Sequence, residues 1–169
     1  MADVEALYAA NHNRLFRYFC RAVGHVEDAR ELTHDVFVRV SRSAIPAGSE
    51  AAQRGWLFQI ARNLVLDHQR TGRRRPRMET LEDTPRAASQ ETSVEINEAL
   101  AALSDVDRDV FLLREIAGLG YDDIASACGI TPDAVRNRLH RARLQLRDRL
   151  SGPIAARLLV PLRRSGRDT

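Results

Sequence analysis

The chain has 169 residues, with 26 basic and 23 acidic side chains and a net charge of +3; every basic residue is an arginine. A hydrophobic content of 44% excludes a wholly disordered chain, and no apolar run approaches the roughly 18 residues of a membrane span. Cys20 and Cys128 lie far apart without a CxxC pair, which argues against a disulfide or a thiolate metal site. We expect a cytoplasmic protein that binds no metal or cofactor.

Charge is separated along the chain. Residues 61–77 carry a net charge of +5 and residues 132–149 carry +4, whereas residues 78–110 between them carry −7. Two basic blocks on either side of an acidic one predict two surfaces that bind a polyanion and an intervening region that the polyanion repels.

The first half of the sequence predicts three amphipathic helices. Apolar residues recur at helical spacing over about residues 3–23 and 26–42, and again from Trp56 through Val65 toward Arg70. Residues 41–54 contain Ser, Pro and Gly, which predicts a loop between the second and third helices. Three such helices can enclose one small core, so residues 1–75 are expected to form a domain.

Residues 76–93 are predicted to be a flexible acidic linker because they contain Pro76, Pro85 and little apolar content. Beyond it, residues 94–150 again have a helical pattern, and residues 151–169 form a weakly amphipathic tail. The sequence therefore predicts an all-α protein of two small helical domains.

The second domain contains the pattern of a helix-turn-helix. After an apolar stretch over residues 94–103, Ser104 is a candidate N-cap for a helix that ends near Gly118. A short element over residues 121–128 is followed by Gly129, and Thr131 with Pro132 marks the start of a long basic helix. A short helix, a Gly-containing turn and a basic second helix form the arrangement that enters the major groove of DNA.

The long basic helix has separate apolar and polar faces. At about 100° per residue, an apolar stripe comprises Val135, Leu139, Ala142 and Leu146, and the candidate base-reading residues opposite it are Arg136, Asn137, His140 and Arg141. Arg can pair with guanine and Asn with adenine. Arg138 and Arg143 lie on the flanks, where phosphate contacts or intramolecular pairs with Asp or Glu are expected. An ordinary solvated helix face is the alternative.

Two segments of the first domain, together with the second domain, resemble bacterial RNA polymerase sigma factors of the extracytoplasmic-function (ECF) group. Residues 28–40 (DARELTHDVFVRV) resemble their second conserved region, and residues 56–67 (WLFQIARNLVLD) resemble their promoter-melting segment. Residues 101–150 are similar to their fourth region. The similarity runs in order over about residues 3–150.

This resemblance implies roles for particular residues. Glu31, Asp35 and Arg39 would dock on the clamp helices of the largest subunit of core RNA polymerase. The alternative is that these three residues form an ordinary exposed, ion-paired helix face. The helix-turn-helix would contact the minus thirty-five element near the polymerase flap region. The residues expected to contact the minus ten element are Trp56, Arg62, Asn63, Asp67, Arg70, Arg73 and Arg74, with Arg75 in the same cationic track; Trp56 also fits a place in the core. An anti-sigma protein is a further partner implied by the family.

Two other functions compete with a non-catalytic sigma factor. A stand-alone helix-turn-helix regulator explains the second domain, but it does not need a second basic block next to an aromatic helix. A metal-dependent nuclease would use His12, His34, His68 and Asp67, which are scattered and contain no HExxH pair.

Overall fold

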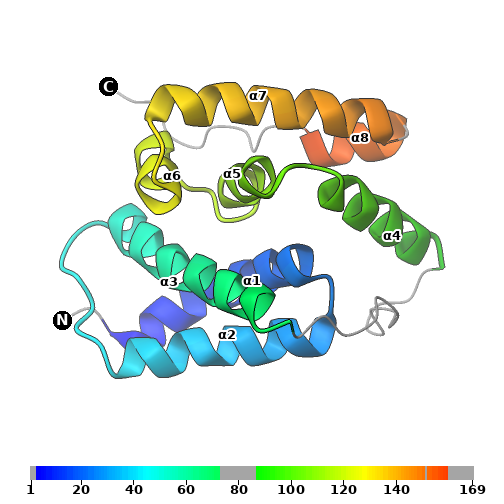
Figure 1. Cartoon of the computed structure of the whole chain (residues 1–169). Coiled ribbons are helices and arrows are strands. Elements are labelled where there is room, and N and C mark those ends of the chain that lie inside the picture. The colour runs from blue at the N-terminus through cyan, green and yellow to red at the C-terminus, as the bar shows by residue number, and fades with distance from the viewer. Residues whose placement is uncertain (1–2, 73–86, 151, 160–169) are drawn as a thin grey trace.

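The computed structural model describes residues 3–72, 87–150 and 152–159, which form eight α-helices and no β-strand. The prediction of an all-α protein is confirmed. In chain order the helices are α1 (Val4–Val23), α2 (Val26–Ser41), α3 (Glu50–Arg70), α4 (Ala87–Ala101), α5 (Asp105–Glu115), α6 (Tyr121–Cys128), α7 (Pro132–Arg149) and α8 (Gly152–Leu159). Figure 1 shows them in two groups, α1–α3 below and α4–α8 above, which we call the first and second modules.

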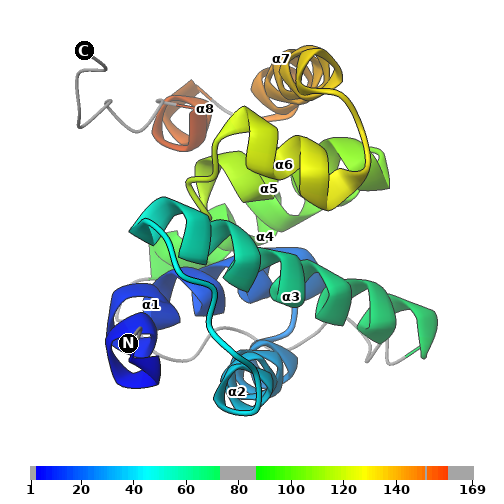
Figure 2. The same cartoon turned by 90° about the vertical axis from the view of Figure 1, so that its left-hand side faces the viewer.

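The first module is held together by the apolar stripes of its three helices. The side chains of Leu15, Phe19, Val36, Leu57 and Phe58 have no exposed surface. Helix α1 begins where the side chain of Asp3 accepts a hydrogen bond from the Glu5 amide, and it ends at Gly24, whose φ of 70° lies in the left-handed region that favours glycine. Helix α2 then returns antiparallel to α1 below α3 (Figure 2).

Two helices begin earlier than the sequence pattern predicts. Helix α3 starts at Glu50 because the hydroxyl of Ser49 accepts a hydrogen bond from the Ala52 amide, so the predicted loop over residues 41–54 ends at Ser49. Helix α4 starts at Ala87, within the predicted linker over residues 76–93, and its first turn carries no amphipathic signal. The rest of that linker, residues 76–86, lies outside the described residues.

The second module contains the predicted helix-turn-helix. Helix α6 ends at Gly129, with a φ of 66°, and α7 begins at Pro132 after Thr131, whose hydroxyl accepts a hydrogen bond from the Ala134 amide. Ser104 caps α5 by accepting a hydrogen bond from the Asp107 amide. The apolar stripe of α7 is buried as predicted (Val135, Leu139, Ala142, Leu146).

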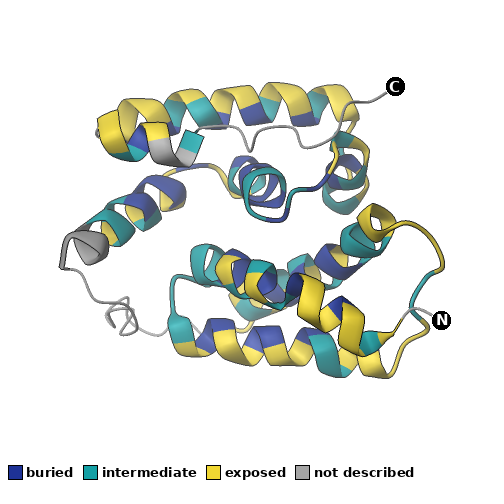
Figure 3. Ribbon diagram, turned by 180° about the vertical axis from the view of Figure 1, so that it is seen from behind, coloured by how far each residue is buried: buried dark blue, intermediate teal, exposed yellow. Residues whose placement is uncertain are grey.

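The two modules pack against each other through α5 and α6. These two helices lie between α7 and the first module, so that α7 is on the far side of the molecule from α2 (Figures 1 and 2). Helix α1 contacts α5, and α3 contacts α6. Exposed residues line the outer faces of α7 and α2 (Figure 3). Both faces are therefore open to partners in this arrangement.

Candidate nucleic-acid interface

The polar face of α7 is presented to solvent. Arg136, Asn137, His140 and Arg141 are all exposed, whereas the flanking Arg138 and Arg143 are partly buried. The N-terminal half of α7 thus carries two arginines, an amide and an imidazole on one open face. Such a face fits the edges of base pairs in the major groove.

A buried carboxylate on α5 holds two of the α7 arginines. Arg141 donates through Nε to Oδ2 of Asp107 at 3.1 Å and through Nη2 to Oδ1 at 3.0 Å, and Arg138 donates through Nη1 to Oδ1 at 2.9 Å. The side chain of Asp107 is only 4% exposed, whereas that of Arg141 is 54% exposed. The pairing of Arg138 is of the intramolecular kind predicted for the flanks. The pairing of Arg141 was missed, because no local pattern links positions 107 and 141.

Two further arginines of α7 are oriented by neighbouring side chains. Arg136 forms an ion pair with Asp133 at 2.8 Å, and its guanidinium lies 5.6 Å from the centre of the Tyr121 ring. Arg114 also lies over this ring, at 5.0 Å. Arg143 pairs with Glu115, as the prediction for the flanks allowed. The polar face of α7 is therefore attached to α5 and α6 at several points.

Helix α3 presents a second polar stripe. Asn63, Asp67 and Arg70 are exposed, and their spacing of four and three residues places them on one side of α3. Trp56, at the start of the same stripe, is half-buried and packs against the core, as its alternative interpretation expected. Arg73, Arg74 and Arg75 lie outside the described residues.

Arg62 does not join this stripe. It points toward the second module, where its Nη2 lies 3.1 Å from Oδ2 of Asp109 and its Nη1 donates to the carbonyl of Ala127 at 3.0 Å. Nearby, a Cβ added at Gly55 would lie 3.2 Å from the carboxylate of Asp123, so glycine lets α3 and α6 approach closely. In this arrangement Arg62 belongs to the contact between modules and not to an open cationic track.

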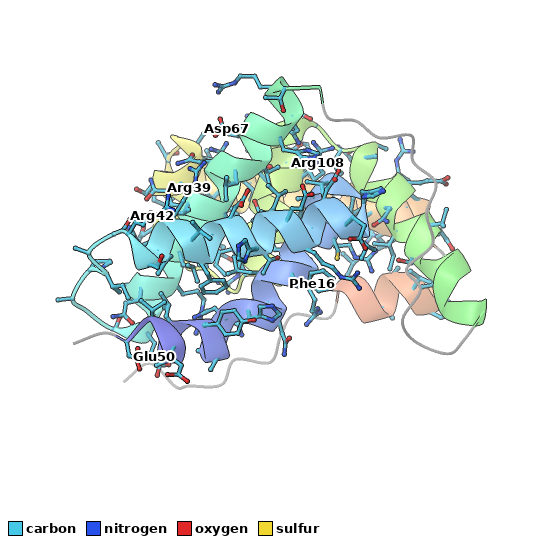
Figure 4. The ribbon with its side chains drawn as sticks, turned by 90° about the horizontal axis from the view of Figure 1, so that it is seen from below. Phe16, Arg39, Arg42, Glu50, Asp67 and Arg108 are labelled. Atoms are coloured by element: carbon cyan, nitrogen blue, oxygen red, sulfur yellow. The ribbon has the colours of Figure 1, made fainter. Side chains whose placement is uncertain are left out.

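The predicted polymerase-binding residues lie together on α2. Glu31, Asp35 and Arg39 are exposed and follow one another at four-residue spacing. None of the three forms an ion pair within the described part of the chain, whereas Arg30 and Glu27 on the same helix pair with each other. Figure 4 shows the molecule from this side and labels Arg39 on α2 and Asp67 on α3.

The residues of the nuclease alternative are not gathered into a site. His12, His34 and His68 lie on three different helices, and Nε2 of His68 is 3.1 Å from Oδ2 of Asp28. Among the described residues, no group of three or more His, Cys, Asp or Glu side chains is placed to hold a metal ion. Cys20 and Cys128 are both partly buried thiols. No helix in the described ranges is long and apolar enough to cross a membrane.

A helix-turn-helix with an open basic face, joined to a second helical module with its own polar stripes, is the arrangement typical of DNA-binding proteins of the helix-turn-helix class. Comparison with known families identifies both modules. The family described as Sigma-70 region 2 matches residues 7–75, and the family described as Sigma-70, region 4 matches residues 93–146.

Named relatives cover most of the chain. ECF RNA polymerase sigma factor SigE of Mycolicibacterium smegmatis is 34% identical over 163 residues, which are 89% of this chain and 63% of that protein. ECF RNA polymerase sigma factor SigC of Mycobacterium tuberculosis is 34% identical over 147 residues, which are 83% of this chain and 79% of that protein. The chain therefore belongs to the ECF sigma-factor family, although it spans less than two thirds of the length of the SigE relative.

Solved structures share the fold. CnrH, in a complex with the cytosolic domain of CnrY, is 26% identical with a TM-score of 0.66, and the match covers 86% of this chain and 85% of CnrH. The sigma factor RpoE of Bartonella quintana, in a complex with the anti-sigma factor NepR, is 20% identical with a TM-score of 0.67. That match covers 88% of this chain and 96% of RpoE, and at this identity it supports the fold alone.

Proposed function

We propose that this protein binds core RNA polymerase and directs transcription initiation at particular promoters, without catalysis of its own. Helix α7 would read the minus thirty-five element, the polar stripe of α3 together with Arg73 and Arg74 would contact the minus ten element, and α2 would dock on the clamp helices. The observation that carries this proposal is the open face of α7, where Arg136, Asn137, His140 and Arg141 are exposed on a helix-turn-helix.

The proposed task requires the two modules to separate. The centres of the two promoter elements lie about 25 base pairs apart, which is about 85 Å along B-form DNA. A compact body of 169 residues has a radius of gyration of about 15 Å, so the packed arrangement is too small to occupy both elements. Sixteen positions, 71–86, separate the end of α3 from the start of α4, and the covalent reach of a chain of sixteen residues is about 50 Å. Together with the size of the modules, this reach is enough for both contacts.

The proposal can be tested by transcription in a purified system. Core RNA polymerase with this protein should give run-off transcripts from a subset of a randomised promoter library, and core polymerase alone should not. The subset should share two sequence elements, at the spacing that two modules impose. If the protein yields no promoter-specific transcript from the library, the proposal is wrong.

A stand-alone regulator makes a different prediction. Such a protein would bind its operator tightly without polymerase, and substitution of the α2 face would leave that binding and its regulatory effect unchanged. We expect instead that Asp35→Arg abolishes specific transcription by weakening the complex with core polymerase. Glu98→Arg is the matched control, because Glu98 is an exposed acid of α4, a helix of the second module, and so lies outside the docking stripe of α2. Equal loss in both variants would argue against the docking role of Asp35.

An anti-sigma protein is also a proposed partner. The solved complex of Bartonella quintana RpoE contains one, and this chain has the same two-module fold. The polar faces of α2, α3 and α7 are the surfaces that such a partner would have to cover to prevent initiation. Co-purification with a candidate partner, followed by loss of transcription in the run-off assay, tests this proposal.

A further inference from the structure

One carboxylate of the second module accepts hydrogen bonds from two arginines of α7. Asp107 lies in the first turn of α5, where its amide is fixed by the Ser104 hydroxyl and its side chain is almost fully buried. Both of its oxygens accept from Arg141, and Oδ1 also accepts from Arg138. The acceptor is therefore held rigidly by the fold, while the side chain of Arg141 remains more than half exposed.

The geometry of this pair leaves a defined edge of Arg141 available. A guanidinium is a planar fork with five N–H donors. Asp107 uses the edge that contains Nε and Nη2, so the outer edge formed by Nη1 and Nη2 keeps two parallel donors. Those two donors match the O6 and N7 acceptors of guanine in the major groove. The ion pair thus orients Arg141 for reading and does not consume its reading edge.

The same carboxylate also limits the positive charge near the DNA. Arg138 and Arg141 together carry two positive charges, and Asp107 cancels one of them. Arg138 is 33% exposed and donates through Nη1 to Asp107 at 2.9 Å, so this donor is not free to bind a phosphate. Attraction to phosphates raises affinity for every sequence equally, whereas base contacts discriminate between sequences.

We propose that Asp107 is a positioning residue for promoter recognition: it fixes Arg141 so that the outer edge of the guanidinium reads a guanine, and it restrains Arg138 from binding phosphate. This inference rests on the proposed function, because it needs α7 to read the minus thirty-five element. Asp107 itself would not contact DNA. It would act through the two arginines. Because the ion pair already orders Arg141 in the free protein, Arg141 would lose less conformational freedom on binding DNA.

The decisive measurement is discrimination at one base pair. Holoenzyme assembled from core polymerase and the full chain would first be used to select upstream elements from randomised duplexes. The base pair whose preference disappears in Arg141→Ala is the position that Arg141 reads. Asp107→Asn should lower the preference for guanine at this position about two- to tenfold, which is the range expected when a reading side chain loses its preorganisation.

Two further readouts separate positioning from a purely structural role. Asp107→Asn should strengthen binding to an unrelated duplex and should steepen the dependence of log K on log[salt] by about 1, because Arg138 becomes free to bind a phosphate. In the Arg141→Ala background, Asp107→Asn should have no further effect on the guanine preference. A loss of folding would weaken binding to all duplexes together and would leave the ratio between them unchanged.

Asp148→Asn is the control for charge, because it removes one negative charge from an exposed position on α7, the helix of Arg141, without freeing a base-reading arginine. It should leave the guanine preference unchanged. If Asp107→Asn leaves that preference intact while Arg141→Ala removes it, the positioning role is wrong and the proposed function stands. If Arg141→Ala itself leaves every preference unchanged, the role of Asp107 is overturned together with the assignment of Arg141. If the wild-type holoenzyme selects no sequence, the proposed function is wrong as well.

Discussion

Arg62 of α3 and Asp109 of α5 form an ion pair that joins the two modules, with 3.1 Å between Nη2 and Oδ2 and side-chain exposures of 15% and 11%. Burial raises the pKa of Asp109, although the neighbouring charges of Arg62 and Arg108 act in the opposite direction. The carboxylate is therefore costly to bury, and Arg62 is its principal compensation. Because Arg62 also donates to the carbonyl of Ala127, it cannot reach promoter DNA while the modules remain packed.

Asp109→Ala should shift the protein toward separated modules. Without its partner, the guanidinium of Arg62 is hydrated fully only when α3 leaves α5. The lost charged hydrogen bonds contribute about 1–3 kcal/mol, or about a 5- to 150-fold change in the equilibrium between packed and separated forms. Energy transfer between dyes at Ser41→Cys and Asp148→Cys, in a chain that also carries Cys20→Ala and Cys128→Ala, measures this shift.

Asp105→Ala is the control for this experiment. Asp105 is an acid of α5 that pairs with Arg108 and has a side chain 86% exposed. Energy transfer should remain at the wild-type level in this variant and should fall in Asp109→Ala. Equal transfer in all three proteins would show that the Arg62 pair does not hold the modules together.

The contribution of Asp107 to stability should depend on pH in a defined direction. Burial acts to raise the pKa of Asp107, but hydrogen bonds from Arg141, Arg138 and Ser104 outweigh it and hold the pKa below its usual value. An acid whose pKa is lower in the folded state stabilises the fold above the unfolded-state pKa of about 3.9, and this stabilisation is lost as pH falls through the lower folded-state value. The effect of Asp107→Asn should therefore be full at pH 7 and should shrink below about pH 4.

Urea unfolding at pH 7, 5 and 3 tests this dependence. At pH 7 and pH 5 the substitution should lower the free energy of unfolding by about 1–3 kcal/mol, since a buried acceptor for two guanidinium groups is weakened. At pH 3 the difference between the two proteins should be smaller. A difference that is constant over the whole range would show that the charge of Asp107 does not provide the stabilisation.

The fold could be predicted from the sequence wherever the signal was local. Helical periodicity and side-chain caps located seven helices or their cores, and Thr131 with Pro132 marked the start of α7 correctly. The N-cap of α3 at Ser49 was overlooked, because it follows Pro, Ala and Gly, a composition typical of a loop. The first turn of α4 has no apolar periodicity at all, so its start could not be read.

The contacts that define the site could not be predicted from local sequence patterns. Arg62 pairs with a residue 47 positions away, and Arg141 with one 34 positions away. Arg62 was expected in a cationic track, and helical geometry correctly placed Arg141 outside the apolar stripe of α7. It could not predict which carboxylates would face them, because that depends on how α3, α5 and α7 pack.

Substitutions of the two basic regions should differ in kind. Arg136→Ala should alter the preferred upstream sequence, with a loss of about 1–3 kcal/mol at the base pair that it reads. Arg73→Ala combined with Arg74→Ala should weaken binding to all promoters and should reduce the magnitude of the salt slope by about 1.5 to 2, as expected for two lost phosphate contacts. Selection from randomised promoters and salt titration of holoenzyme binding measure the two effects, and Arg17→Ala, an exposed arginine of α1, is the control. The same pattern of change in both sets would remove the distinction between base reading and phosphate contact.

The two thiols should react slowly with alkylating agents. Burial raises the pKa of Cys20 to about 11, although the positive charges of Arg21 and Arg30 act against this, and burial also raises the pKa of Cys128. Because only the thiolate reacts, and an unburied thiol has a pKa of about 8.5 to 9, the thiolate fraction of Cys20 at pH 8 should be about a hundredfold lower in the folded protein than in the unfolded chain. Mass spectrometry of iodoacetamide labelling, with and without urea, gives the two rates. Rapid labelling of folded Cys20 at pH 8 would contradict the raised pKa and would point to a reactive thiol beside α2.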